Sequence, residues 1–502
     1  MGVLVLVLVS AAAARRDFIG DGVRHIPAAL SGEVLLGEPR WLLFPAFVSA
    51  VLRPLQAVGA LPDIERAIQP LLWLSVACGA AFLLSLNRWL RAECDDGVRR
   101  AGALMLAGSC APFLILFSDV GEVQLAAAIA AAGLAYARVR PHHERGAIVA
   151  IAAIGGATLI YQGAVLAIGM LPLVTGDMLR RRRVTIMLCG TVALVLLIMV
   201  AAQVIAGTSL SAAIATTLGG ERNVLTRSFM SHRSIGEYAV ALIAGPPQGI
   251  VSLTRFEGLA ALIASLRTPA AGSFFVAVTN TLRLLLGAAC VGVLATAAIR
   301  GRDWRLPFAA LVILALPVMR NQQYGYVKFY ALWPIPVALA ALRCRPRVVA
   351  AIAAAVITAN VWLLAEDISR GRRAYATIRG AYQQAGPATC WLTTGWAPPF
   401  WYLWPGTAAP ILGTLGTGVD ARRQAEGLTG SLRRCFCGSA AVWTDATTRD
   451  AALVSTLADH FEYREHDLRS MLLDDSQPML TPGIRVYGEA RRQDVCNALT
   501  PR

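Results

Sequence analysis

The sequence predicts a mainly α-helical protein that crosses a membrane about eleven times and ends in a small α/β domain. Composition, apolar runs and the placement of arginines lead to this prediction. Of the 502 residues, 56% are hydrophobic and only 15% are charged, whereas about a quarter of the residues in a soluble domain are charged. The mean hydropathy of +0.57 points the same way. The composition therefore excludes a soluble enzyme built around one large core.

Eleven apolar segments predict the spans, because a helix needs about 20 apolar residues to cross the hydrocarbon layer. They are 1–14, 66–87, 101–117, 123–137, 146–161, 162–179, 184–206, 274–299, 306–319, 330–342 and 347–365. The further apolar stretch 41–59 contains Arg53 and Pro54, so we expect an interfacial or re-entrant helix there. Small residues at the end of 1–14 would suit signal-peptide cleavage, but no basic residue precedes the run, which favours a retained first helix.

Arginine clusters predict the orientation of these spans. The loops 88–100, 138–145, 180–183, 300–305 and 343–347 hold 4, 3, 4, 3 and 3 arginines. Because short cytoplasmic loops are enriched in Arg and Lys, these five connections are predicted to be cytoplasmic. The segments that then face outward are 15–65, 118–122, the turn near Tyr161, 207–273, 320–329 and everything after 366. The net charge of +15 follows from this topology, and the basic residues form no single face that would indicate a nucleic-acid partner.

The tail 366–502 is long enough for one small domain, so we divide the chain into a transmembrane domain, 1–365, and an extracytoplasmic α/β domain, 366–502. Short strands are expected at 388–394, 439–444 and 484–487, alternating with helices at 367–385 and 447–460.

Four cysteines of the tail indicate an oxidising compartment. Cys390, Cys435, Cys437 and Cys496 form an even set that permits one or two disulfides. Free thiols are the alternative, and zinc is disfavoured because no histidine lies near Cys435 and Cys437. The pairing stays open at this stage.

The first outer loop opens with the sequence RRDFIGDGVRH, from Arg15 to His25. Asp17 and Asp21 follow directly after a membrane helix, where ionisable residues are costly and often functional. The alternative is that Asp21 caps a helix over 22–31, a frequent role for aspartate. A cap and a catalytic base are compatible roles for one carboxylate.

The second outer turn, 118–122, reads SDVGE. Asp119 and Glu122 are three residues apart and share one face if a helix starts here. They could bracket a hydroxyl acceptor or hold a divalent cation through oxygen ligands. The alternative is a capping box, in which Ser118 or Asp119 is the cap and Glu122 completes it.

The third element, 320–330, reads RNQQYGYVKFY and contains Lys328, the single lysine of the chain. Both Arg320 and Lys328 are suited to binding a phosphate. The arginine offers a planar fork of N–H donors, and the lysine offers a compact positive charge. The amide and phenol groups of Gln323, Tyr324, Tyr326 and Tyr330 are candidates for a donor or acceptor pocket. An aromatic belt at the membrane interface is the alternative, but it does not explain the amides and the lysine.

The sequence from Asp21 to His25 resembles the start of the first outer loop in GT-C glycosyltransferases. This superfamily includes protein O-mannosyltransferases and the lipid A aminoarabinose transferase. The juxtamembrane helices of this superfamily contain a pattern of small residues and prolines. A similar pattern follows here, with Gly32, Gly37, Pro39 and the pair Phe44-Pro45. Gly22 replaces the second acidic residue of the family pattern, and the first loop has no lysine.

The resemblance implies an inverting transfer of a sugar from a polyprenyl-phosphate donor to a hydroxyl acceptor, with lipid, glycan and protein as the open alternatives. Asp21 is then the general base, with Asp17, Asp119 and Glu122 as further catalytic candidates. Arg320, Lys328, Arg24 and Arg40 are candidates for the donor phosphate, and His25 for the pocket. The resemblance implies no obligatory cofactor; a divalent cation, Mg²⁺ or Mn²⁺, is a candidate at Asp21, Asp119 and Glu122. The implied place is the bacterial inner (cytoplasmic) membrane, with the C-terminal domain periplasmic.

Two other classes stay open. A polysaccharide polymerase or O-antigen ligase would use Arg222, Arg227, His232 and Arg233 of the long loop 207–273, which we expect to lie over a cavity as a lid. A polytopic transporter would place charged groups or broken helices at mid-membrane, whereas the spans here carry almost no charge.

Overall fold

The computed structural model describes residues 1–15, 42–61, 64–140, 143–176, 181–205, 207–218, 246–252, 271–301, 304–319, 330–385, 389–392, 435–444, 479–481 and 484–499, and four single residues besides, namely 26, 29, 179 and 433. The chain divides into two compact units. The first comprises Met1–Arg15 and Ile19–Ser369, and the second is formed chiefly by Arg370–Arg502.

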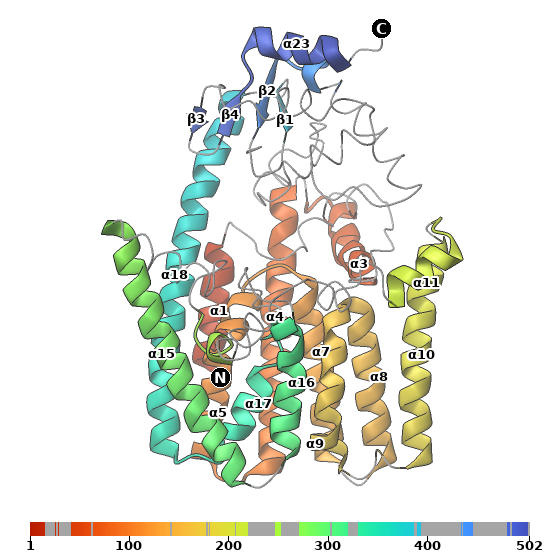
Figure 1. Cartoon of the computed structure of the whole chain (residues 1–502), viewed down its shortest axis with the longest axis vertical. Coiled ribbons are helices and arrows are strands. Elements are labelled where there is room, and N and C mark those ends of the chain that lie inside the picture. Colours follow the sequence, from red (N-terminus) through yellow and green to blue (C-terminus); the bar gives the residue numbers. More distant parts are fainter. Residues whose placement is uncertain are drawn as a thin grey trace. The chain divides into compact units, whose positions relative to one another are not determined.

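Each apolar segment predicted to be a span is helical. The helices are α1 (Gly2–Ala14), α4 (Ile64–Glu93), α5 (Gly97–Ser109) with α6 (Ala111–Leu116), α7 (Glu122–Val139), α8 (Glu144–Ile160), the 3₁₀ helix η2 (Gln162–Met170) with α9 (Leu171–Thr175), α10 (Arg182–Ile205), α15 (Ala271–Arg300), α16 (Arg305–Met319), α17 (Pro334–Ala341) and α18 (Pro346–Ala385). Figure 1 shows α4, α7, α8 and α10 as successive neighbours. The mainly helical fold class is confirmed.

Five helices of the described residues are long and apolar enough to cross a membrane. They are Arg66–Glu93, Glu122–Val139, Arg182–Ile205, Val278–Arg300 and Pro346–Arg373. Shorter apolar helices accompany them at Gly2–Ala14, Gln162–Thr175 and Arg305–Leu314. The chain is therefore a helical membrane protein, and the number of eleven spans stays a prediction.

Charged residues at several helix ends form ion pairs with one another. Arg138 at the end of α7 forms an ion pair with Glu93 at the end of α4. Arg181, before α10, lies 3.1 Å from Glu144 at the start of α8. All four residues belong to segments that were predicted to lie on the same side of the membrane. Their contacts support the alternation of sides along the chain.

The amphipathic stretch 41–59 contains α3 (Phe44–Ala57). Its 14 residues span about 21 Å, less than the ~30 Å of the hydrocarbon layer. Phe44, Val48 and Leu52 are buried along one face. A helix too short to span is thus confirmed here, and its place at the interface stays a prediction.

Part of the long loop 207–273 is inserted among the helices. Ile250 and Val251 are fully buried, and the Ile250 carbonyl accepts from Ala111 N at 3.1 Å and from Asn360 Nδ2 at 2.7 Å. The expectation that this loop lies over a cavity as a lid is therefore wrong for 246–252. The physical reason is that Ala111 follows the break between α5 and α6, where a backbone N–H buried in the bundle needs an acceptor.

The second unit contains a four-stranded sheet with the order β1-β2-β4-β3. Its strands are β1 (Thr389–Leu392), β2 (Ala441–Thr444), β3 (Met479–Thr481) and β4 (Ile484–Val486), followed by α23 (Glu489–Leu499). β1 and β2 are parallel, while β4 pairs antiparallel with both β2 and β3. The three predicted strands are present, whereas β3 and α23 were not predicted. The predicted helix 447–460 lies outside the described residues.

Two disulfides, Cys390–Cys435 and Cys437–Cys496, join the elements of this unit. They tie β1 and α23 to the segment that precedes β2. Of the alternatives that the sequence left open, disulfides are correct and free thiols are wrong for these four cysteines.

Close packing of α7 on α8 depends on Gly133. A Cβ at this position would lie 2.4 Å from Ala153 Cβ and 3.4 Å from Ala150 Cα, atoms that cannot move without moving α8. Small residues permit such close approach of helices in membranes.

We therefore predict that Gly133→Ala lowers the free energy of unfolding by about 1–3 kcal/mol, the usual cost of overpacking. Gly190→Ala in α10 is the matched control, because a Cβ there meets nothing within 4 Å. Thermal unfolding in detergent measures both variants. Equal melting temperatures for the two would contradict the packing argument.

Candidate functional site

The acidic turn, residues 118–122, joins α6 to α7 and is buried. Asp119 and Glu122 are each only 1% exposed, and Ser118 is fully buried. Carboxylates are almost never fully buried unless a partner or a function requires it. Their burial makes this turn a candidate catalytic or ligand-binding site.

The carboxylates of the turn do not cap α7. The N-cap is Gly121, which has no side chain to offer, and Glu122 is the first helical residue. Asp119 Oδ1 accepts from the adjacent Val120 N at 2.8 Å. The capping-box interpretation is therefore wrong. A true cap exists elsewhere, where Asp96 Oδ1 accepts from Val98 N at 2.9 Å and starts α5.

Hydrogen bonds hold the backbone of the turn from within. Gln124 Nε2 reaches back from α7 and donates to Leu116 O at 2.7 Å and to Asp119 O at 3.1 Å. Ser118 Oγ lies 2.8 Å from Leu114 O, within donating distance. Glu122 stands at the positive end of the α7 dipole, which stabilises a negative charge. These hydrogen bonds hold the backbone from which both carboxylates project.

Arg15, at the end of α1, contacts the same turn. Its side chain is 1% exposed, and Nη2 donates to Ser118 Oγ at 3.2 Å. Nη1 lies 3.7 Å from Asp367 Oδ2 on α18. Arg15 stands at the start of the predicted first outer loop, and the sequence pattern assigns it no role. The only sequence signal was a charged residue directly after an apolar helix.

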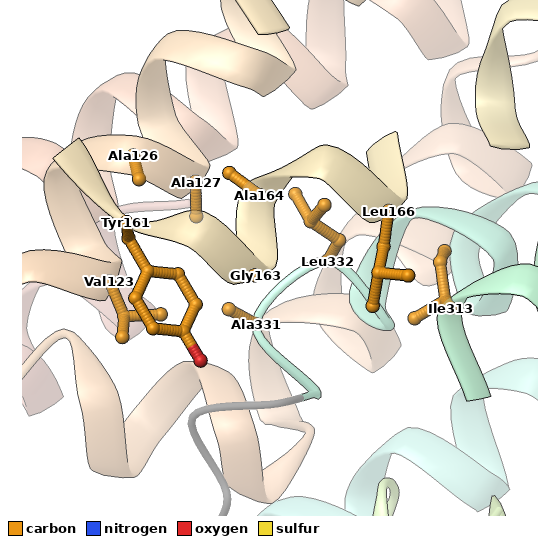
Figure 2. Close-up of a pocket in the computed structure, with 10 residues that line it drawn as sticks. All are labelled: Val123, Ala126, Ala127, Tyr161, Gly163, Ala164, Leu166, Ile313, Ala331 and Leu332. Carbon is orange, nitrogen blue, oxygen red and sulfur yellow. The ribbon is translucent and has the colours of Figure 1, made fainter. Parts of the chain in front are cut away.

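A small cavity lies next to the acidic turn, where three predicted outer turns meet. It is lined by Val123 of α7, by Tyr161 and η2, by Ile313 of α16 and by Ala331 and Leu332 (Figure 2). Its volume of about 20 Å³ is enough for one water molecule. Val123 directly follows Glu122, and Ala331 directly follows Tyr330. The structure thus brings the neighbours of two predicted site residues to one cavity.

Tyr161 closes one side of this cavity. The residue interrupts the helical path between α8 and η2 with an extended backbone, and its ring lies between Val123 and Ala331 in Figure 2. A Cβ on Gly163 would lie 2.4 Å from the Tyr161 Cε1 atom. Glycine is therefore required for the ring to occupy this place.

An apolar groove of about 250 Å³ lies on the other side of η2. Its walls are made by side chains of α8, η2 and α10, among them Ile151, Ile154, Val165, Ile168, Val192, Val195, Leu196 and Met199. In a 3₁₀ helix, residues three apart lie in line. Gln162, Val165 and Ile168 therefore line the groove, while Gly163 and Leu166 line the small cavity.

Of the predicted site residues, Asp119, Glu122 and Tyr330 are described, and all three are buried. The others lie outside the described residues, namely Asp17, Asp21, Arg24, His25, Arg40, Arg320, Gln323, Tyr324, Tyr326 and Lys328. Within the described part of the chain, no group of three or more His, Cys, Asp or Glu residues could hold a metal ion.

Comparison of the whole fold with solved structures finds similar structures, among them two of one protein. One is ArnT from Cupriavidus metallidurans bound to undecaprenyl phosphate, with a TM-score of 0.50 and 13% sequence identity over 88% of this chain and 92% of that chain. The other is the same protein in the apo state, with a TM-score of 0.50 and 13% identity over 98% and 97% of the two chains.

The chain has the fold of ArnT. The resemblance to GT-C glycosyltransferases that the first loop indicated is thereby confirmed at the level of the fold. No protein-family model and no curated protein sequence matches the chain.

The position of the Tyr161 ring gives a prediction. Gly163→Ala should force the ring out of its place and lower the free energy of unfolding by about 1–3 kcal/mol. Gly156→Ala in α8 is the control, because a Cβ there meets nothing within 4 Å and alanine favours a helix by about 1 kcal/mol over glycine. Thermal unfolding and an electron cryomicroscopy structure of Gly163→Ala measure the effect. An unmoved ring would contradict it.

Proposed function

We propose that this protein is an inverting glycosyltransferase that moves a sugar from a polyprenyl-phosphate donor to a hydroxyl acceptor at the outer face of the membrane. One observation carries the proposal: the acidic turn holds two buried carboxylates, and neither of them caps α7. The shared fold with ArnT, which was solved bound to undecaprenyl phosphate, supports the class of donor.

In the proposed reaction, the acceptor hydroxyl attacks the anomeric carbon from the side opposite the phosphate. Asp21 removes the proton of the hydroxyl as general base. Asp119 and Glu122 orient the acceptor, and Asp17 is a further candidate on the first loop. The bond from the anomeric carbon to the phosphate oxygen breaks, and the electron pair leaves with the polyprenyl phosphate.

Cationic groups stabilise the leaving phosphate in this proposal. Arg320 and Lys328 neutralise the charge that develops there, assisted by Arg24 and Arg40. The pocket for the sugar is formed by side chains with donor and acceptor groups, namely His25, Gln323, Tyr324, Tyr326 and Tyr330. Among them Tyr330 is described, and it is 3% exposed next to the small cavity.

The apolar groove provides a place for the donor tail. A polyprenyl chain offers no hydrogen-bonding group, so burial of apolar surface supplies its binding free energy at about 25 cal/mol per Å². The groove is lined mainly by aliphatic side chains, and one of its walls is α10, which is long and apolar enough to cross a bilayer. It therefore matches the chemistry of the proposed donor.

A divalent cation, Mg²⁺ or Mn²⁺, belongs to the proposal as an ion held by Asp21, Asp119 and Glu122. Carboxylate oxygens are the ligands that these ions prefer. Asp119 and Glu122 lie in one buried turn. Asp21, the third carboxylate of the proposed set, belongs to the first loop. No step of the proposed reaction passes through the ion.

We also propose that the protein lies in the bacterial inner membrane with its second unit in the periplasm. The disulfides Cys390–Cys435 and Cys437–Cys496 support this placement, because disulfides persist in oxidising compartments such as the periplasm. In the first unit, all the described cysteines are free thiols.

Substitution of the acidic groups tests the function. Asp21→Asn should lower kcat about 100-fold or more, the usual contribution of a general base, and Asp119→Asn should lower it while preserving the acceptor oxygen for Val120 N. The assay follows release of undecaprenyl phosphate from a panel of undecaprenyl-phosphate sugars, with a membrane lipid and glycan extract as acceptor.

Asp96→Ala is the matched control for a structural aspartate. It removes a true N-cap and should cost about 1 kcal/mol of stability while leaving kcat unchanged. Full activity of Asp21→Asn would remove the proposed base. A fall in melting temperature for Asp119→Asn as large as for Asp96→Ala would show a structural role instead.

The groove gives an independent prediction. Leu196→Trp places an indole in the groove and should raise KM for a long polyprenyl-phosphate sugar several-fold, with little effect on a short-chain analogue. Leu197→Trp on the same helix is the control, because Leu197 is 64% exposed and is not among the residues that line the groove. Steady-state kinetics with both donors measure the difference. Equal KM values for the two variants would place the tail elsewhere.

A further inference from the structure

Arg15 makes contacts that the proposed reaction does not use. Arginine is almost never fully buried without a partner, yet this side chain is 1% exposed. Its two terminal nitrogens reach different elements: Nη2 contacts Ser118 Oγ at 3.2 Å, and Nη1 approaches Asp367 Oδ2 at 3.7 Å. One planar guanidinium thus joins the end of α1, the acidic turn and α18.

Stability alone does not explain this arrangement. Desolvation of two buried charges offsets much of their attraction, and apolar side chains of similar size often replace a buried ion pair at no cost. A buried ion pair contributes more to selecting one conformation of the segments that it joins than to overall stability. The geometry that Arg15 fixes is that of the acidic turn.

The path from Arg15 to the carboxylates is short. Ser118 Oγ accepts from Arg15 and lies within donating distance of Leu114 O, at 2.8 Å, and of Ile115 O, at 3.1 Å. The next residue, Asp119, donates its N–H to Leu116 O at 2.9 Å. Movement of Ser118 would therefore shift the backbone that carries Asp119.

We propose that Arg15 is a positioning residue that holds the acidic turn, and with it Asp119 and Glu122, in the geometry required for sugar transfer. The inference rests on the proposed function. Lysine would serve less well, because its three donors share one nitrogen, whereas two separate nitrogens of the guanidinium reach Ser118 and Asp367.

Two variants separate positioning from folding. Ser118→Ala removes the hydrogen bond between Arg15 and the Ser118 hydroxyl and leaves the ion pair between Arg15 and Asp367 in place. Because removal of Arg15 alone would strand a buried Asp367, the second variant is the double substitution Arg15→Met with Asp367→Leu, which removes both charges. Ser75→Ala is the matched control: Ser75 is also buried and also bonds the carbonyl four residues earlier, Leu71 O at 3.1 Å.

Hydrogen–deuterium exchange of the amides of Asp119 and Val120 reports on the turn without any assay of activity. We expect exchange at least ten-fold faster in Ser118→Ala and in the double variant, and unchanged in Ser75→Ala. The kcat of both test variants should fall about ten-fold or more, since one hydrogen bond to a charged group is worth at least that factor. KM for the donor should change less than two-fold.

Unchanged exchange in both test variants would overturn the proposal, and so would faster exchange with an unchanged kcat. If Ser118→Ala lowers the melting temperature but leaves the kcat of the folded protein intact, Arg15 is structural and the proposal fails. Absence of sugar transfer by the wild-type protein would contradict the proposed function itself. The exchange rates would still decide whether Arg15 holds the turn.

Discussion

Every buried backbone group in the bundle needs a hydrogen-bond partner, because lipid supplies none. Helices satisfy this constraint by themselves, so the informative places are those where a helix breaks. At the break between α5 and α6, Ser109 O accepts from Asn360 Nδ2 at 2.7 Å and Ala111 N donates to Ile250 O. The same amide of Asn360 also reaches Ile250 O. The backbone groups left unpaired at this break thus find their partners in the irregular segment 246–252 and in Asn360 on α18.

The acidic turn also contains buried polar groups that need partners, and some of these groups are charged. Gln124 from the following helix donates to the Asp119 carbonyl of the turn and to Leu116 O just before it. The Ser118 hydroxyl of the turn contacts a guanidinium that is itself paired with Asp367. Buried charges of this kind lower stability unless they are matched. Sites of chemistry commonly retain such groups in spite of that cost, which is why the turn is a more persuasive site than an exposed pair of carboxylates at the same spacing.

The sequence predicted the parts of this structure that depend on local pattern. Runs of apolar residues identified the helices, and three strands of the second unit followed from β-branched and aromatic residues. The carboxylates at Asp119 and Glu122 were selected by position alone, while the choice between capping and function needed the geometry around Gly121. Contacts between distant segments were out of reach: Arg15 and Ser118 are 103 residues apart, and Asn360 and Ser109 are 251 apart. The short strand β3 lacks the alternation that reveals longer strands.

The order of the cysteines has a consequence for how the protein is made. Along the chain, the first of the four pairs with the second and the third with the fourth. For a tail secreted from its N-terminal end, as proposed above, this is the order in which thiols reach the oxidising side. A thiol oxidase that joins each cysteine to the previous free one would produce the native pairs directly. Biogenesis of the second unit would then depend on an oxidase and would need no disulfide isomerase.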